Sequence, residues 1–322
     1  MNSISDRIKE EARRLGFEKI GFARAEILAA EGPHLLQWLA RGYQGTMSWM
    51  DRTKSKRVDP RQVYEGALSV VSVAMNYYTD AQHPEKGSGT GKISRYAWGD
   101  DYHEILSERL EQLLENIKRI APGADGKVYV DTGPVMEKVW AQHAGIGWIG
   151  KHTNLITPDL GSWVFLGEIL LNVELEYDQP ATDHCGTCTL CIEACPTEAI
   201  VEPYVLDSTK CISYLTIEHR GPIPAELGEK FENWVFGCDI CQDVCPWNLK
   251  FQTSGNIAGF DPRIGNVAPQ LAELAEIGDN EFRDRYRNSP VKRAKADGLR
   301  RNAAVNLHQH QEVNKHGKKG IT

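Results

Sequence analysis

The spacing of apolar residues predicts helices and strands that alternate along the first half of the chain. Apolar residues three or four positions apart indicate helices, and short runs of mostly β-branched residues indicate buried strands. The predicted helices cover residues 4–15, 33–41, 101–120 and 134–144, and the predicted strands cover 17–23, 67–78, 127–131 and 164–173. We therefore expect residues 1–178 to form an α/β domain, in a chain of overall class α+β/α/β.

The pattern changes after residue 178. Regular elements become short, and all the cysteines fall between Cys185 and Cys245. Residues 179–250 are therefore predicted to form a separate cysteine-rich domain, and residues 251–322 a basic, partly helical region. A helix is expected from Val291, with Leu299 and Ala303 on its apolar side, and the polar end of the chain is expected to be frayed.

Composition and charge limit the classes of protein. With 41% hydrophobic and 25% charged residues, the chain is ordinary for a globular protein. No run of eighteen apolar residues occurs, so no membrane span is expected. No apolar stretch follows Arg13 and Arg14, as an export signal would require, and we expect a cytoplasmic protein. The net charge of −7 argues against nonspecific nucleic-acid binding by the whole surface, although residues 283–301 are locally basic.

The cysteine spacing is typical of a protein with two [4Fe–4S] clusters. The first run, C-x2-C-x2-C-x3-C-P, comprises Cys185, Cys188, Cys191 and Cys195. In such a run the fourth cysteine ligates the other cluster. The second and incomplete run, C-x2-C-x3-C-P, comprises Cys238, Cys241 and Cys245. Cys211, displaced upstream by an insertion, is expected to supply the missing ligand.

The crossed pairing predicts which cysteines share a cluster. One cluster is expected on Cys185, Cys188, Cys191 and Cys245, and the other on Cys195, Cys211, Cys238 and Cys241. Zinc is the first alternative, but a zinc ribbon uses two C-x2-C pairs and leaves the longer run unexplained. Disulfides are the second, and they require an oxidising compartment. Clusters indicate electron transfer without identifying the substrate.

Motifs outside the cysteines resemble those of epoxyqueuosine reductases. They are RYAWGDDYH at 95–103, VDTGP at 130–134, QHAGIGWIGKH at 142–152 and CISYLTIE at 211–218. The ferredoxin-type run and the insertion between Cys211 and Cys238 match as well. The resemblance extends over about residues 1–307, with several independent motifs in the same order and spacing.

The resemblance implies a reaction and its cofactors. Epoxyqueuosine reductases remove the epoxide oxygen from epoxyqueuosine at the wobble position of a tRNA anticodon, the last step of queuosine synthesis, using cobalamin and two [4Fe–4S] clusters. Their N-terminal domain is a cobalamin-binding α/β fold related to that of reductive dehalogenases, and their C-terminal part is a HEAT-like helical repeat. The expected partners are the tRNA and a small external electron donor of ferredoxin or flavodoxin type, and we expect a monomer.

By the same resemblance Asp131 is the general acid that protonates the departing oxygen. Such an acid needs a raised pKa. Its place in the sequence agrees, because a strand end followed by Thr-Gly-Pro puts the carboxyl on a loop that faces a cleft. The alternative is that Asp131 caps a helix whose first turn contains Pro134.

Histidine ligation of cobalt is not expected. The nearest match to the cobalamin pattern D-x-H-x-x-G begins at Asp101, lacks the glycine and lies on an amphipathic helix. His103 is therefore expected on the helix surface or beside the site, and the cobalamin is expected to be base-off.

The resemblance implies that Asp131 also contacts the corrin, together with nine other residues. Arg57 is expected to meet its polar edge, with a solvated loop charge as the alternative. Ser213 and Asp239 are expected between the corrin and the nearer cluster, the one on Cys195, Cys211, Cys238 and Cys241. Six further residues lie in segments that would line the pocket, although several could belong to the core: Ser94, Tyr96, His152, Thr153, Leu155 and Leu166.

The basic segment is expected to contact tRNA phosphates, with a solvated helix face as the alternative. The candidates are Arg283, Lys292, Arg293, Arg300 and Arg301. Residues 299–307 resemble the opening helix of the HEAT-like region, but the remaining repeat helices are absent. Because a solenoid repeat without a neighbour leaves its apolar face open, we expect this truncated end to be poorly ordered and the tRNA affinity to be reduced.

Two other functions are considered. A cobalamin-dependent, reductive dehalogenase-like reductase of a small molecule would share the cofactors, but the missing export signal and the basic segment disfavour it. A ferredoxin-type electron carrier would leave the N-terminal domain and the Asp131 loop without a role.

Overall fold

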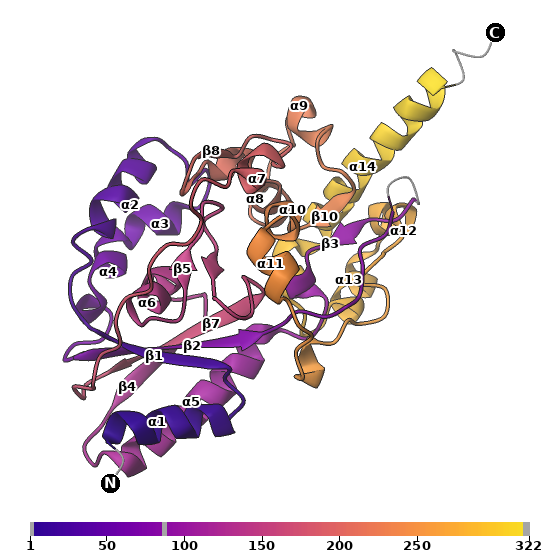
Figure 1. Ribbon diagram of the computed structural model, residues 1–322. Coiled ribbons are helices and arrows are strands. Elements are labelled where there is room, and N and C mark those ends of the chain that lie inside the picture. The colour runs from indigo at the N-terminus through magenta and orange to yellow at the C-terminus, as the bar shows by residue number, and fades with distance from the viewer. Residues whose placement is uncertain (1–2, 86–88, 318–322) are drawn as a thin grey trace.

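The computed structural model describes residues 3–85 and 89–317, with side chains as far as residue 309 (Figure 1). Its first half is built on a four-stranded sheet in the order β1-β2-β7-β4. These strands are β1 (Lys19–Arg24), β2 (Ser69–Asn76), β7 (Val164–Leu171) and β4 (Gly126–Tyr129). Every neighbouring pair is antiparallel. The prediction of an α/β domain is therefore wrong for this half, which is α+β.

The error has a physical origin in the burial of the central strands. All eight residues of β2 are buried, and so are six of the eight in β7. A strand buried on both faces gives an almost continuous apolar run, which is the pattern typical of parallel sheets. In this protein helices cover both faces of an antiparallel sheet and produce the same pattern.

One face of the sheet is covered by α1 (Ile4–Arg14) and α5 (Tyr102–Ile120), which lie side by side in Figure 1. Ile8 and Leu110, both without exposed surface, pack there against strand residues such as Val73. Ser3 caps the first helix, because its hydroxyl accepts a hydrogen bond from the Asp6 amide.

The opposite face is covered mainly by α6 (Glu137–His143), with the short helices at residues 31–58 around it. These are α2 (Glu31–Ala40), α3 (Ser48–Arg52) and α4 (Lys54–Val58). The helix approaches β1 closely at Gly21, where a Cβ would lie 1.9 Å from the Ala144 carbonyl oxygen. Only glycine allows this contact, which seats the C-terminal end of α6 directly on the sheet.

The cysteine-rich region consists of short elements. They are α7 (Leu190–Glu193), β8 (Ile200–Glu202), β9 (Val205–Leu206), α8 (Ile212–Ile217), α9 (Ala225–Gly228), α10 (Ile240–Asp243) and α11 (Pro246–Phe251). Two further short strands, β5 (Trp148–Ile149) and β6 (Leu155–Ile156), form an antiparallel pair in the preceding half of the chain. A parallel pair of strands, β3 (Lys92–Ile93) and β10 (Trp234–Phe236), ties the cysteine-rich region to a segment of the N-terminal half.

The C-terminal region packs on that strand pair. It comprises α12 (Leu271–Glu276), α13 (Asp279–Arg285), the 3-10 turn η5 (Pro290–Ala294) and α14 (Lys295–Gly317). Leu299 and Ala303 of α14 have no exposed surface and share a core with Leu271 and Phe236. The expectation of an open apolar face is therefore wrong, because α12 and β10 cover it within the described part of the chain.

Two further expectations for this end differ from the structure. The helix predicted from Val291 begins at Lys295, after the 3-10 turn, and its backbone continues to Gly317 instead of fraying from residue 308. The last residues of the predicted frayed end, 318–322, lie outside the described residues. No helix in the described part of the chain has both the length and the apolar character needed to cross a bilayer.

Candidate active site

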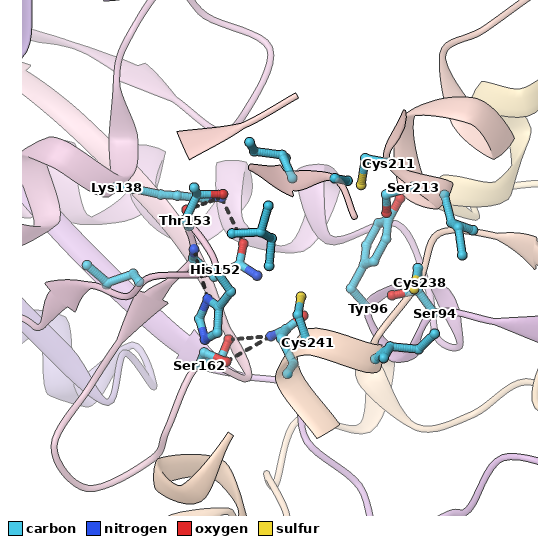
Figure 2. Close-up of a pocket in the computed structure, with 18 of the residues that line it drawn as sticks. Ser94, Tyr96, Lys138, His152, Thr153, Ser162, Cys211, Ser213, Cys238 and Cys241 are labelled. Atoms are coloured by element: carbon cyan, nitrogen blue, oxygen red, sulfur yellow. Dashed lines mark hydrogen bonds between the residues drawn. The ribbon is translucent and has the colours of Figure 1, made fainter. Parts of the chain in front are cut away.

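A cavity of about 410 Å³ lies between the sheet half of the protein and the cysteine-rich region. Figure 2 shows Lys138, His152 and Thr153 on one wall and Tyr96, Ser213 and Cys211 on the other. The apolar part of the lining comes largely from β7 and from the β8–β9 hairpin. The cavity is thus enclosed by two parts of the chain that are distant in sequence.

The eight cysteines are divided between this cavity and a smaller one of about 140 Å³. The large cavity is lined by Cys195, Cys211, Cys238 and Cys241. The small cavity is lined by Cys185, Cys188, Cys191 and Cys245. This division is the crossed grouping expected from the cysteine spacing. It arises because α7 and α10, each of which belongs to one of the two cysteine runs, lie against each other.

The thiols are free and partly or fully buried. None of the eight forms a disulfide. Burial raises the pKa of the Cys191 thiol to about 11 and raises that of Cys238 as well. No three His, Cys, Asp or Glu side chains among the described residues gather closely enough to hold one metal ion. Each set of four instead surrounds a cavity, as ligands of a multinuclear cluster do, whereas a zinc site needs its ligands around one point.

Asp131 follows β4 on a loop that faces the large cavity. Its φ of 53° is in the left-handed region, which is unusual for a residue other than glycine. The Asp131 amide donates a hydrogen bond to Glu137 Oε1, and Asp131 Oδ2 lies 3.3 Å from His103 Nε2. The helix predicted from Pro134 begins instead at Glu137, without a side-chain cap, so Asp131 is not its cap.

The expectation that the pKa of Asp131 is raised is wrong, because the charges around the carboxyl group lower it. Burial alone would raise the pKa of Asp131, but hydrogen bonds from His103 and Tyr102 and the charges of His103 and Lys138 lower it below its usual value. Burial would lower the pKa of His103, but its contacts with Asp101 and Asp131 outweigh burial and raise it to about 9. At neutral pH the proton of this pair therefore resides on the imidazole.

A second pair of carboxyl groups lies beside the loop. Burial and the nearby Asp131 charge raise the pKa of Glu137 to about 8, and burial raises the pKa of Glu168 well above its usual value. Glu168 lies in β7 without exposed surface, and among the described residues its oxygens have no hydrogen-bond partner other than the Glu137 carboxyl group. A hydrogen bond between the two carboxyl groups requires that one of them be protonated.

Sequence reasoning missed these two glutamates, and it placed His103 on the helix surface or beside the site without giving it a role in the reaction. A signal existed for Glu168, because it is the single charged residue inside the apolar run predicted as the strand at 164–173. A buried charge is costly unless it is paired or neutral, so its position alone marks it for attention.

Eight of the ten residues predicted to contact cobalamin line the large cavity. They are Ser94, Tyr96, Asp131, His152, Thr153, Leu155, Leu166 and Ser213. Arg57 and Asp239 are not among the lining residues. Arg57 is partly buried, and the charges of Asp131 and Glu137 act on its guanidinium, so it is not a freely solvated loop residue.

Asp239 is fully buried behind the cavity wall. Its carboxylate accepts hydrogen bonds from the Ser94 hydroxyl and from the Arg95 amide, the latter at 2.8 Å, and lies 3.1 Å from His83 Nε2. It therefore reaches the cavity through Ser94, while its neighbour Cys238 lines the cavity directly.

The wall opposite Tyr96 is polar. Lys138 Nζ donates to the Thr153 carbonyl at 3.0 Å and to Asn154 Oδ1 at 2.9 Å, as the dashed lines in Figure 2 show. Thr153 has a φ of 66°, the second left-handed residue other than glycine in this cavity. Burial lowers the pKa of His152 to about 4, and its buried Nε2 has no hydrogen-bond partner. An unpaired buried atom on this wall is suited to a polar group of a bound molecule.

The predicted tRNA-binding cations have different surroundings. Arg301 donates to the backbone carbonyls of Leu215, His219 and Gly221, so it fixes the end of α8. Arg300 binds the Ile277 carbonyl and two aspartates, and Arg283 binds Asn280.

The two remaining cations lie near the active-site loop. Lys292 contacts Asp101 at 2.6 Å, while Arg293 makes a bidentate pair with Glu218 and is influenced by the Asp131 charge. The side chains of Lys292 and Arg293 remain more than half exposed.

These features define a class of protein. Two sets of four thiols are arranged in the order of a two-cluster ferredoxin, and the inner set shares a cavity with a carboxylate, an imidazole and an ammonium group. This is the arrangement of an iron–sulfur oxidoreductase that delivers electrons and protons to one enclosed site.

Comparison with known proteins identifies the family. The family model described as epoxyqueuosine reductase QueG, DUF1730, matches residues 57–132, and the model for a 4Fe-4S double cluster binding domain matches residues 184–248. The epoxyqueuosine reductase of Cellulophaga algicola is 47% identical over 298 residues, which cover 92% of this chain and 96% of the relative. This chain belongs to the epoxyqueuosine reductase family.

Solved structures agree. A crystal structure of epoxyqueuosine reductase with an epoxyqueuosine-modified tRNA-Tyr stem loop is 32% identical, with a TM-score of 0.87, and the match covers 95% of this chain and 81% of that one. The epoxyqueuosine reductase from Bacillus subtilis was solved with its aspartate-bearing catalytic loop swung out of the active site. It is 30% identical, with a TM-score of 0.87, and the match covers 96% of this chain and 82% of that one.

Proposed function

We propose that this protein reduces epoxyqueuosine to queuosine at the wobble position of tRNA. The observation that carries the proposal is that the Asp131 loop and the four inner cysteines open on the same cavity. Removing an epoxide oxygen as water and leaving a double bond takes two electrons and two protons. The cavity has a route for both, because thiol-bound clusters carry electrons and the His103–Asp131 pair carries a proton.

Two [4Fe–4S] clusters occupy the two sets of cysteines in this proposal. The set that includes Cys185 and Cys245 would hold an outer cluster, which would serve as the entry point for electrons from a small donor of ferredoxin or flavodoxin type. The set that includes Cys195 and Cys211 would hold an inner cluster beside the large cavity, where it would supply one-electron transfer. Support comes from the double-cluster match over residues 184–248 and from the division of the cysteines between the cavities.

The large cavity suits cobalamin. A corrin is an apolar macrocycle with amides at its edge, and the lining combines apolar residues such as Leu155 and Leu166 with polar groups such as Ser94, Ser213 and the unpaired His152 Nε2. Bound there, cobalamin supplies a metal centre that transfers electrons to carbon.

We further propose a base-off cobalamin without a histidine ligand, and the contacts of His103 support this proposal for that residue. Its Nδ1 is bound to Asp101 and its Nε2 to Asp131, so neither nitrogen is available to a metal. Arg57, near the Asp131 loop, is suited to the polar edge of the corrin.

Asp131 is the group that hands protons to the epoxide oxygen in this proposal. Its side chain lines the cavity and is 61% exposed, and its loop is held by the amide hydrogen bond to Glu137. Lys292 and Arg293, close to this loop, are the strongest candidates for tRNA phosphates, whereas Arg301 serves the fold.

The proposal also covers the domain boundaries, the oligomeric state and the location of the enzyme in the cell. We infer three segments, 1–178 for the cofactor and catalysis, 179–250 for the clusters, and 251–322 as a basic helical region that resembles the start of a HEAT-like repeat. The enzyme acts as a monomer in the cytoplasm, where its tRNA substrate is made and used.

The deciding experiment measures tRNA nucleosides. The gene is deleted in a queuosine-making cell, and digested tRNA is examined by mass spectrometry. Epoxyqueuosine should accumulate, and it should be cleared by the wild type but not by Asp131→Asn. Because Asn lacks a transferable proton but keeps the shape, the variant should bind iron as the wild type does, and the control Asp159→Asn, in an exposed loop, should clear epoxyqueuosine. Unchanged queuosine in the deletion strain would refute the function.

A further inference from the structure

His103 stands between two carboxylates at the start of α5. Asp101 caps this helix by accepting a hydrogen bond from the His103 amide at 3.2 Å, and its Oδ1 also lies 2.7 Å from His103 Nδ1. The other ring nitrogen, Nε2, lies 3.3 Å from Asp131 Oδ2. The imidazole thus connects a buried carboxylate on one side with the cavity-facing carboxylate on the other.

The surroundings fix the ring and keep it charged. Tyr102 stacks on it at 4.1 Å between ring centroids, and Lys292 from η5 binds the second oxygen of Asp101 at 2.6 Å. Beyond Asp131, the titratable groups that face this site include Arg57, Glu137, Lys138 and Arg293. The two adjacent carboxylates favour the imidazolium and raise the pKa of His103 to about 9, while the pKa of Asp131 is lowered.

The proposed reaction needs more protons than Asp131 can hold. Reduction of one epoxide to an alkene and water consumes two electrons, supplied by the external donor through the clusters, and two protons. Asp131 can carry one proton at most, and beside His103 it is ionised. Another group must therefore reload it, and that group must touch its carboxyl oxygen.

We propose that His103 is the proton donor to Asp131, so that each proton taken by the leaving oxygen first passes from His103 Nε2 to Asp131 Oδ2. In each transfer the Nε2–H bond breaks and an Oδ2–H bond forms, and the neutral imidazole keeps its Nδ1–H bonded to Asp101. Asp131 then gives this proton to the oxygen, and His103, whose side chain is 30% exposed, takes another from solvent. His103 acts through Asp131 and does not itself touch the substrate, and this inference rests on the proposed function.

The neighbouring acids are less suited to this task. Glu137 contacts the Asp131 amide, not its carboxyl group, and Glu168 hydrogen-bonds only through Glu137. Among the described residues, Tyr102 also reaches the Asp131 carboxylate, but burial raises the pKa of its phenol well above the usual value, which makes it a poor source of a proton at neutral pH. His103 is the neighbour that combines contact with a proton it can release.

The test uses single turnovers of the reduced holoenzyme on an epoxyqueuosine stem loop across pH 6–10. The wild-type rate should be flat and then fall about tenfold per pH unit above the pKa of His103. In His103→Gln, which keeps a hydrogen-bond donor without a transferable proton, the rate should fall roughly 10²–10⁴-fold and the alkaline decline should disappear. Imidazole added to His103→Gly should restore part of the rate, and more of it at a pH where imidazolium predominates.

A second variant keeps the proposal testable if His103 variants fold poorly. Asp101→Asn can still cap α5, but it removes a charge that favours the imidazolium, so its alkaline decline should move to lower pH. A wild-type rate and profile in His103→Gln, or an unshifted decline in Asp101→Asn, would overturn the proposal. Failure of the wild type to convert the stem loop would instead refute the proposed function.

Discussion

The carboxyl groups of Glu137 and Glu168 are placed where an ionised pair would be unstable. Both are enclosed, and Glu137 holds the Asp131 amide through one oxygen. One shared proton allows the two carboxyl groups to form a hydrogen bond with each other, while Glu137 still accepts a hydrogen bond from the Asp131 amide. These residues therefore determine the position of the Asp131 loop, in a family where this kind of loop is known to swing in the Bacillus subtilis relative.

The raised pKa of Glu137 leads to a prediction about stability. Its folded-state value of about 8 exceeds the 4.5 of an unfolded glutamate, so the folded state holds a proton that the unfolded state loses. Its contribution to stability is therefore complete below pH 4.5 and is lost as the pH rises to about 8. Thermal denaturation across pH 5–9 should show the wild type losing stability, with a smaller slope in Glu137→Gln.

His103 also stabilises the folded state at low pH, over a pH range that overlaps with that of Glu137. Its pKa rises from 6.5 to about 9 on folding, so its contribution is complete below pH 6.5 and is lost by about pH 9. His103→Gln should therefore flatten the curve only above pH 6.5, whereas Glu137→Gln should flatten it from pH 4.5. Parallel curves for the wild type and Glu137→Gln would show that the glutamate is ionised in the folded protein.

Sequence reasoning could identify Asp131 but not its electrostatic state. The strand end and the Thr-Gly-Pro turn placed the carboxyl at a cleft, and the structure has it there. Its pKa depends on His103, twenty-eight positions earlier and on another element, and no spacing rule links the two. The same holds for Glu137 and Glu168, which meet because α6 packs on the sheet face that β7 presents.

At the scale of elements, α14 is tied to its neighbours by buried asparagines as well as by apolar packing. Asn302 Nδ2 donates to the carbonyls of Thr216 and Val235, each at 2.8 Å. One helical turn further on, Asn306 donates to the Trp234 carbonyl and accepts from the Asn233 amide. These bonds complete the backbone of β10, a strand that would otherwise have an unpaired side.

Replacement of Asn302 should therefore destabilise the protein. Asn302→Leu removes the donor and leaves two buried carbonyl groups unpaired, which costs about 1–3 kcal/mol for each group. The exposed residue His308, on the same helix, supplies the control His308→Ala. Chemical denaturation should separate the two variants, and equal stabilities would show that water satisfies the carbonyls in the variant.

The element boundaries show what periodicity can and cannot determine. The helix predicted over 101–120 is observed as α5 with Asp101 as its cap, because a long apolar stripe and a capping residue act together. The helix predicted from Pro134 begins three residues later, since the loop at 131–136 is drawn toward Glu137 and the cavity. The local sequence pattern cannot predict this shift, because it depends on a contact formed only in the folded protein.

At the scale of the whole molecule, the chain crosses between its two sets of four cysteines. Cys195 ends the first cysteine run but lines the large cavity, and Cys245 ends the second run but lines the small one. The sequence allowed this arrangement to be predicted, because the ferredoxin spacing has that geometric consequence. The cavity beside the inner set could not be predicted in the same way, since its walls come from segments as far apart as Ser94 and Cys241.

The crossing can be tested by replacing single cysteines with alanine. Each replacement should lower the iron content of anaerobically purified protein from about eight to about four per chain if the other cluster survives. Cys195→Ala should then show the electron paramagnetic resonance spectrum of Cys211→Ala, in which only the outer cluster remains. Cys245→Ala should show that of Cys188→Ala, in which only the inner cluster remains.

The alternative is a simple pairing by sequence, with Cys195 joined to the first run. In that case Cys195→Ala would match Cys188→Ala, and Cys245→Ala would match Cys211→Ala. Chemically reduced Cys245→Ala should in addition retain single-turnover reduction of the stem loop, because its inner cluster still faces the cavity. Cys195→Ala should lose it, because the outer cluster has no direct access to the cavity that holds Asp131.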